Sequence, residues 1–171
     1  GSSYTVGVLV QANFGLREQL RIAGVPVGKH LREDRIYSEP DPEVDGTGSI
    51  IVVVATDAPL LPHQLKRIAR RAALGLGRNG SIASNGSGDI FVAFSTADDS
   101  LGRADRVLVH RSIPNDAISP LFAATVEATE EAIVNALVSA ETMTGRDGIT
   151  AHRLDHGRLV DVMTRYGRGP A

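Results

Sequence analysis

Six consecutive apolar residues at positions 50–55, Ile-Ile-Val-Val-Val-Ala, restrict the fold of this chain more than any other feature. Continuous rather than alternating hydrophobicity in so short a run predicts a β-strand covered on both faces, as when helices sandwich a sheet. The run follows Gly48 and Ser49 directly, so a serine hydroxyl lies at the start of the predicted buried strand. We therefore expect a layered α and β protein with a polar group at one strand end.

Further strands and helices are expected on both sides of this run. Pro62 suits the first turn of a helix, and Leu65, Ile68 and Ala72 then share one side of it. A strand at 4–10 is expected to end at the turn-forming residues of 11–15. Other strands are predicted at 90–95 and 106–110, and helices at 63–74 and about 120–142. Two segments stay open: 16–22 as a short helix or a strand, and 155–166 as a last helix or a loosely packed tail.

The segment from Gly28 to Gly48 carries charged residues, glycines and prolines with only isolated apolar residues. That composition is typical of a flexible linker. The chain has 171 residues, of which 42% are hydrophobic, and this is enough for one core of ordinary size. We therefore expect a single domain over residues 1–171 that contains a linker at about 28–48.

Charge and residue content exclude several classes of function. The formal net charge is -2, and acids alternate with bases, so a surface for nucleic acid is not expected. The chain has no cysteine, which removes disulfides, thiolate metal sites and cysteine nucleophiles. No run approaches the roughly 18 apolar residues of a membrane span, and the first ten residues do not resemble a signal peptide. No membrane partner is expected, and the compartment, cytoplasmic or periplasmic, stays open.

Two motifs resemble those of ligand sites but lack the flanking elements or further ligands that such sites need. Residues 75–80 match G-x-G-x-x-G, but dinucleotide sites need this motif between a strand and a helix, and here it follows a predicted helix. We interpret it as a helix end and loop. His152 and His156 have the spacing of zinc ligands, without the adjacent glutamate and the further ligand that a metalloprotease needs. We expect surface histidines, no metal and no cofactor.

Ser49 lies at the boundary between the predicted linker and the predicted buried strand, which has a chemical consequence. Gly48 ends the predicted linker and Ser49 begins the strand, so cleavage of the bond between them would leave Ser49 as an anchored N-terminus. Such a residue carries nucleophile and base together, because its hydroxyl attacks and its α-amine, with an unperturbed pKa of about 7.7–8.0, accepts the proton. The same hydroxyl can make the cut by attacking the Gly48 carbonyl, which no side chain obstructs. The position of Ser49 therefore favours a self-cleaving N-terminal nucleophile.

Three motifs together resemble those of a known enzyme family. They are VQANFG at 10–15, GSIIVVVATDAPLLPHQL at 48–65 and NGSGDIF at 85–91. Their sequence and order resemble L-aminopeptidase D-Ala-esterase/amidase (DmpA) and the β-peptidyl aminopeptidases. The resemblance implies an αββα sandwich similar to N-terminal nucleophile hydrolases. It also implies a precursor that cleaves itself at a Gly-Ser bond, and an enzyme that hydrolyses N-terminal residues of peptides, amides or esters through an acyl-enzyme.

The resemblance implies a role for each matching residue. Ser49 would be the nucleophile, and Ser87 a second active-site serine that hydrogen-bonds near it. Asp89 falls where the family has an acidic residue, and would orient Ser87 or bind the free amino group of the substrate. The side-chain amide of Asn13 would help to hold the oxyanion.

Length is the main departure from the family, whose precursors are roughly twice as long. Their N-terminal half also supplies a tyrosine at the oxyanion, and neither Tyr4 nor Tyr37 has the matching context. The resemblance therefore implies the C-terminal portion of a larger unit, with 1–48 as the end of an α chain and 49–171 as a β chain. The expected partners are a peptide or amino-acid amide substrate, the missing N-terminal α portion, and further αβ units in a homo-oligomer.

Two alternatives remain beside this reading. An acyltransferase of the ornithine acetyltransferase type has a related fold and self-cleavage, but a threonine where this chain has Ser49. A catalytically silent structural or interaction domain would keep the fold without the chemistry. Labelling of Ser49 by a serine acylating reagent distinguishes the enzyme from the silent domain.

Overall fold

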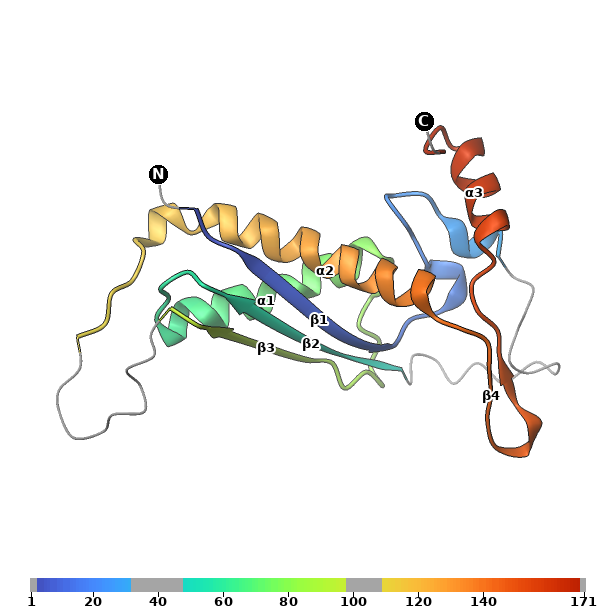
Figure 1. The fold of residues 1–171 in the computed structure, drawn as a ribbon, viewed down its shortest axis with the longest axis horizontal. Helices are drawn as coiled ribbons and strands as arrows, with labels where there is room; N and C mark the ends of the chain where they lie inside the picture. The colour runs from blue at the N-terminus through green and yellow to red at the C-terminus, as the bar shows by residue number, and fades with distance from the viewer. Residues whose placement is uncertain (1–2, 32–47, 98–108, 170–171) are drawn as a thin grey trace.

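The computed structural model describes residues 3–31, 48–97 and 109–169. Its larger sheet holds β1 (Val6–Asn13), β2 (Ser49–Thr56) and β3 (Ile90–Ser95), and its long helices are α1 (Pro62–Arg78) and α2 (Ser119–Ser139). A small hairpin, β4 (Met143–Thr144) and β5 (Thr150–Ala151), precedes the last helix α3 (His156–Arg165). Figure 1 shows the two long helices running along the sheet, with the hairpin and α3 beyond one end of it.

The larger sheet has the strand order β1-β2-β3. β1 is antiparallel to β2, whereas β2 and β3 are parallel and are joined through α1. The predicted strands at 50–55 and 90–95 and the helix at 63–74 are confirmed. The first strand differs from the prediction, because it does not end before residue 11. Gln11, Ala12 and Asn13 pair with the first residues of β2, so cross-strand pairing overrides their local preference for a turn.

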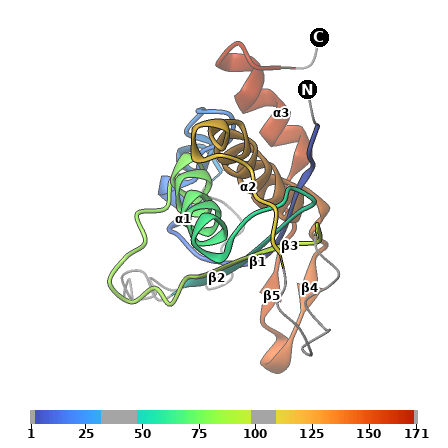
Figure 2. The same cartoon turned by 90° about the vertical axis from the view of Figure 1, so that its left-hand side faces the viewer.

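The hydrophobic core lies between the sheet and the two long helices. Alternate residues of β2, namely Ile50, Val52 and Val54, are fully buried against them. The helices contribute mainly Ile68, Ala72, Leu76, Leu121 and Ile133 to the same cluster. Figure 2, viewed almost along the strands, shows α1 and α2 side by side on one face of the sheet.

The opposite face of the sheet is exposed, which corrects the prediction of a strand covered on both sides. In the described part of the chain, β2 is buried on one face only, and Ile51 on the other face is 40% exposed. Neighbouring large side chains on that face are also exposed, namely Leu9, Ile90, Val92 and Phe94. The described residues therefore leave one face of this apolar run uncovered. We call Leu9, Ile51, Ile90, Val92 and Phe94 the open face.

A glycine brings the two long helices into contact. A Cβ built on Gly75 would lie 2.6 Å from the carbonyl oxygen of Val126, so only glycine allows this approach. α1 continues to Arg78, and Gly80 follows its C-terminal end with φ +99°. The G-x-G-x-x-G stretch thus lies at the end of a helix, as predicted, although the helix ends later than expected.

The segment before the predicted linker is packed. Residues 17–19 and 27–29 form 3₁₀ turns. The open segment 16–22 is therefore neither a regular α-helix nor a strand of the sheet, since it holds one 3₁₀ turn and an isolated bridge from Ile22 to Val25. Leu31 is buried, so the start of the linker expected at 28 is wrong by several residues. A second cluster joins Ile22, Val25, Val27 and Leu31 to Val162 of α3. The remainder of the predicted linker, 32–47, lies outside the described residues.

The structure revises the end of one predicted helix and decides the open segment at 155–166, while the predicted strand at 106–110 lies mostly outside the described residues. α2 ends at Ser139 rather than 142, because Ala140 is extended. The segment 155–166 is a helix, capped by Asp155, whose carboxylate accepts a hydrogen bond from Arg158 N at 3.0 Å; this bond lowers the pKa of the Asp155 side chain. Residues 106–108 are not described, and 109–110 are not in a strand. Among the described helices, none has the length and hydropathy of a membrane span.

Candidate active site

Ser49 and Asn13 lie opposite each other at one end of the sheet. Ser49 is the first residue of β2, and its cross-strand partner in β1 is Asn13. Because successive side chains of a strand alternate between its faces, the burial of Ile50 against the helices directs Ser49 toward the open face. Paired residues of neighbouring strands project to the same side, so Asn13 shares this face. The predicted nucleophile and the predicted oxyanion donor are therefore brought together.

Gly48 packs against the end of β1. A Cβ built on it would lie 2.5 Å from the carbonyl oxygen of Asn13 and 2.8 Å from the Cα of Phe14. Both are backbone atoms, which cannot move aside as the end of a flexible side chain does. The residue before Ser49 is therefore restricted to glycine by its surroundings.

The loop before β3 holds the Ser49 hydroxyl. Gly88 N donates a hydrogen bond to Ser49 Oγ at 2.9 Å. This contact uses a backbone group, so the sequence motif does not indicate that Gly88 is part of the site. An N–H aimed at Oγ stabilises negative charge that develops on this oxygen when it leaves an acyl group.

Asp89 connects the same loop to β2. Its Oδ1 accepts hydrogen bonds from Ser87 Oγ at 2.5 Å and from Ile50 N at 3.1 Å. Its Oδ2 is buried and has no hydrogen-bond partner among the described residues. Because the Ser87 hydroxyl donates its hydrogen bond to Asp89, the lone pairs of Ser87 Oγ remain available to accept another hydrogen bond. Ser87 and Asp89 are thus oriented as a pair beside Ser49.

A pocket of about 340 Å³ adjoins this pair on the side of α1. Its wall includes Ser87 and Asp89 together with Ala73, Leu76 and Phe91. The site therefore combines a hydroxyl on the open face with a carboxylate whose free oxygen lies at the edge of the helical layer.

His156 and Tyr4 lie elsewhere in the fold, whereas His152 lines a pocket that Asn13 also borders. His156 Nε2 lies 2.9 Å from the carbonyl oxygen of Val138, near the end of α2. In the described ranges, no group of three or more His, Cys, Asp or Glu side chains is placed to hold a metal. Tyr4 precedes β1 at the end of that strand away from Asn13, and Tyr37 lies outside the described residues.

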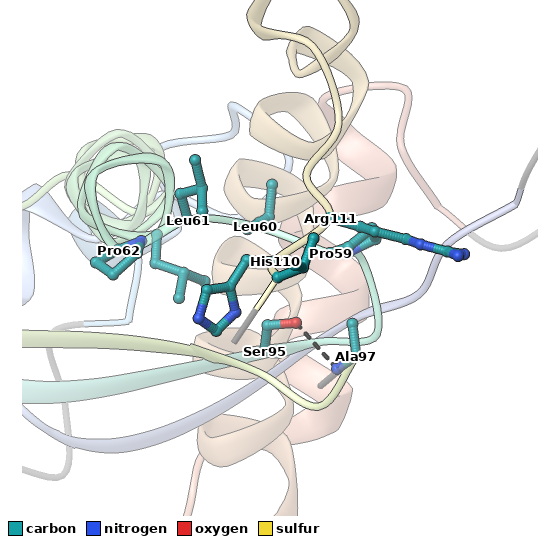
Figure 3. A pocket seen from close by; sticks show the side chains of 10 residues that line it. Pro59, Leu60, Leu61, Pro62, Ser95, Ala97, His110 and Arg111 are labelled. Atoms are coloured by element: carbon teal, nitrogen blue, oxygen red, sulfur yellow. Dashed lines mark hydrogen bonds between the residues drawn. The ribbon is translucent and has the colours of Figure 1, made fainter. Parts of the chain in front are cut away.

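A further pocket of about 460 Å³ lies at the opposite end of β2. Figure 3 shows His110 directed into it, opposite Ser95, while Arg111 extends outward. Ser95 Oγ donates to the carbonyl oxygen of Ala58 at 2.6 Å. This pocket is remote from Ser49, since the eight residues of β2 separate them.

Comparison with known proteins identifies relatives along almost the entire chain. The model of peptidase family S58 matches residues 1–151. A β-peptidyl aminopeptidase BapA from Sphingosinicella microcystinivorans is 52% identical over 98% of this chain, and one from Sphingosinicella xenopeptidilytica is 46% identical over 94%. The matched regions make up 45% and 42% of these two proteins, so the chain spans less than half the length of these relatives.

Solved structures agree in fold. The PH0078 protein from Pyrococcus horikoshii OT3 superposes with a TM-score of 0.85 at 50% identity, covering 96% of this chain and 44% of that protein. The L-aminopeptidase D-Ala-esterase/amidase from Ochrobactrum anthropi, described as a variant of the Ntn hydrolase fold, gives 0.84 at 44% identity, covering 98% of this chain and 45% of that protein. The predicted fold class, a portion of an αββα sandwich of the N-terminal nucleophile type, is confirmed. The described residues supply one helical layer and one sheet layer of it.

Proposed function

Because this chain belongs to peptidase family S58, we propose that it carries the catalytic serine of a self-processing aminopeptidase. The observation that carries the proposal is the arrangement around Ser49. The Ser49 hydroxyl accepts a hydrogen bond from Gly88 N and lies beside the Ser87–Asp89 pair. The residue before Ser49 must be glycine, because a Cβ there would collide with the backbone of β1. This arrangement supports the chemistry of an N-terminal nucleophile.

Self-cleavage begins with attack of Ser49 Oγ on the carbonyl carbon of Gly48. The C–N bond breaks, the amine of Ser49 takes up a proton, and Gly48 becomes esterified to Oγ. Water then hydrolyses the ester, leaving a carboxylate on Gly48 and a free α-amine on Ser49. This amine is the base for the enzyme's next reaction.

Turnover repeats the same steps on a substrate. Ser49 Oγ attacks the substrate carbonyl while its α-amine accepts the hydroxyl proton and passes it to the leaving amine. Ser87 Oγ accepts a hydrogen bond from the α-amine, and Asp89 fixes Ser87 in this orientation. The Asn13 side-chain amide donates to the oxyanion, and water releases the acyl group from Ser49.

The relatives support a proposal for the substrate class. The named relatives are β-peptidyl aminopeptidases and an L-aminopeptidase D-Ala-esterase/amidase. We therefore propose a short peptide or amino-acid amide with a free amino group as the substrate. The Asp89 side chain is the proposed partner for this amino group, because it is an acid that holds Ser87 beside Ser49.

The exposure of the open face supports the proposal that a further polypeptide segment covers it. Its large apolar side chains are exposed, as with Leu9 at 72% and Phe94 at 44%, and Ser49 projects to the same side. We propose that an N-terminal α portion covers this face and forms the second wall of the substrate pocket. Assembly of such αβ units into a homo-oligomer is part of the same proposal.

Intact mass measurement of the purified full-length protein tests the proposal. We expect two polypeptides, one ending at Gly48 and the other beginning at Ser49, together with hydrolysis of an amino-acid amide. A serine acylating reagent should add one acyl group per site at Ser49. A protein that stays uncut and unlabelled at Ser49 would instead be the catalytically silent domain.

Substitution of Asp89 by asparagine is expected to lower kcat by about 10²-fold with little loss of folding. Asparagine keeps an oxygen that can accept from Ser87 Oγ and Ile50 N, but it removes the negative charge. Steady-state kinetics with an amino-acid amide measure the effect, and Asp89→Glu, which restores the charge, should recover part of the rate. An Asp89→Asn protein with the original kcat and KM contradicts both proposed roles of the carboxylate.

A further inference from the structure

The β4–β5 hairpin projects from the body of the fold. Figure 1 shows it beyond the end of the larger sheet at which β1 ends and β2 begins. Figure 2 shows that it extends to the side of this sheet opposite α1 and α2, which is the side of the open face. His152, the residue after β5, borders the same pocket as Asn13. The hairpin therefore starts next to the candidate active site and extends past the sheet toward the side that Ser49 faces.

The hairpin is short for a structure that stands apart from the core. Residues 143–144 pair with residues 150–151. Gly145 N adds one hydrogen bond to this ladder by donating to the carbonyl oxygen of Ile149 at 2.8 Å. An isolated two-stranded hairpin is at best marginally stable in water. Contact with a further surface is therefore expected to stabilise it.

The two faces of the hairpin differ in chemistry. Paired residues project to the same side, so Met143 and Ala151 share one face. Ile149 lies on this face too, because its backbone is extended and it precedes Ala151 by two residues. Thr144 and Thr150 lie on the opposite face, where their hydroxyl oxygens are 2.8 Å apart. We call Met143, Ile149 and Ala151 the apolar hairpin face.

The described residues leave the apolar hairpin face largely uncovered. Met143 is 68% exposed and Ile149 is 41% exposed, although both side chains are large and apolar. Removing such surface from water is favourable in proportion to its area, and it would stabilise a marginal hairpin. Thr144 and Thr150 need no cover, because hydroxyl groups are well solvated. The hairpin thus has one face suited to a polypeptide partner and one suited to water.

The position of the hairpin indicates which polypeptide this partner is. The described residues supply one helical layer and one sheet layer of an αββα sandwich, so the other two layers belong on the side of the open face. The hairpin extends to that same side. A stable interface between separate molecules buries about 1,200–2,000 Å² in total, far more than two large side chains supply. The apolar hairpin face is therefore the margin of a larger contact, and the open face beside it is that contact.

We propose that the apolar hairpin face binds the same N-terminal α portion that covers the open face. The hairpin contacts the α portion at the end of the sheet that carries Ser49 and Asn13, and its threonine face stays in water. The inference rests on the proposed function for the existence of the α portion. It does not depend on self-cleavage or on a catalytic role of Ser49.

Site-specific photo-cross-linking in the full-length protein identifies what covers this face. The photoreactive residue p-benzoylphenylalanine replaces Met143 in one variant and Thr144, its neighbour on the opposite face, in the other. We expect position 143 to cross-link to the α portion, at residues outside 1–171 that peptide mapping by mass spectrometry identifies, and we expect loss of this cross-link at position 144. A cross-link from position 143 to a second copy of the hairpin or of α3, equal cross-linking from both positions, or no cross-link would overturn the proposal.

Lysine substitutions measure what the contact contributes. In the cut protein, Met143→Lys should lower the urea concentration at which the α and β polypeptides separate, equivalent to an association at least about tenfold weaker, because a charge would lose its water in an apolar contact. Thr144→Lys is the matched control on the opposite face and should leave the urea concentration unchanged. The same urea concentration for Met143→Lys as for the original protein would contradict the proposal.

Ser49→Ala separates failure of this contact from failure of the proposed function. The cross-link from position 143 should form equally in the Ser49→Ala protein, because the hairpin contact does not involve the hydroxyl. An original protein that stays uncut but gives the cross-link would refute self-cleavage and support the hairpin contact. A cut and active protein without the cross-link would overturn the hairpin contact alone.

Discussion

Replacing Ser49 by alanine is expected to leave one uncut polypeptide and to lower kcat/KM by at least about 10³-fold. Both effects share one cause, because the same hydroxyl is proposed to attack the Gly48 carbonyl and the substrate. Alanine also has no oxygen to accept the hydrogen bond from Gly88 N. Intact mass and amide hydrolysis, measured on the same preparation, give the two results together.

Two further variants show whether the hydroxyl itself is responsible. Ser49→Thr keeps a hydroxyl group and should retain some self-cleavage, at a reduced rate because the added methyl group crowds Gly88. Ser84→Ala is the matched control, since Ser84 lies earlier in the same loop and contributes its backbone carbonyl to a turn with Ser87 N. Cleavage between residues 48 and 49 in the Ser49→Ala protein would show that another group performs the attack, and the proposed mechanism would then fail.

Much of the fold could be predicted because local patterns determine it. Pro62 begins α1, the apolar run defines β2, and turn residues at 85–89 precede β3. Two expectations failed for non-local reasons. Residues 11–13 form a strand because the start of β2 pairs with them. The apolar run of β2 indicates burial on two faces, but a sequence pattern does not show which residues cover each face, and the described residues cover only one.

The candidate site was predicted in part. Asn13, Ser49, Ser87 and Asp89 were identified by their motifs, and the structure places all of them around the first residue of β2. Gly88 was missed, because its contribution is a backbone N–H that any residue type except proline provides.

Replacing Gly48 by alanine is expected to slow self-cleavage by about 10²-fold or more while Ser49 stays intact. The added Cβ would lie 2.5 Å from the carbonyl oxygen of Asn13 and 2.8 Å from the Cα of Phe14, so the Gly48 peptide must move. Attack requires the reacting atoms to approach to about 3–3.5 Å in the correct direction, and a displacement near 1 Å costs on the order of 10²-fold in rate. The fraction of cut chain after synthesis, followed by intact mass over time, measures the change.

The effect of Gly48→Ala should arise from this contact and not from the general loss of a glycine. Gly77→Ala is the control, because a Cβ on Gly77 has nothing within 4 Å and alanine is favoured in a helix such as α1. Thermal unfolding of the uncut Gly48→Ala protein shows whether it is folded, and molecules that do become cut should turn over substrate normally, because they carry the same N-terminal Ser49. Cleavage of Gly48→Ala at the original rate would mean that the Gly48 peptide is free to move in the precursor, and the close packing against Asn13 would then not guide the attack.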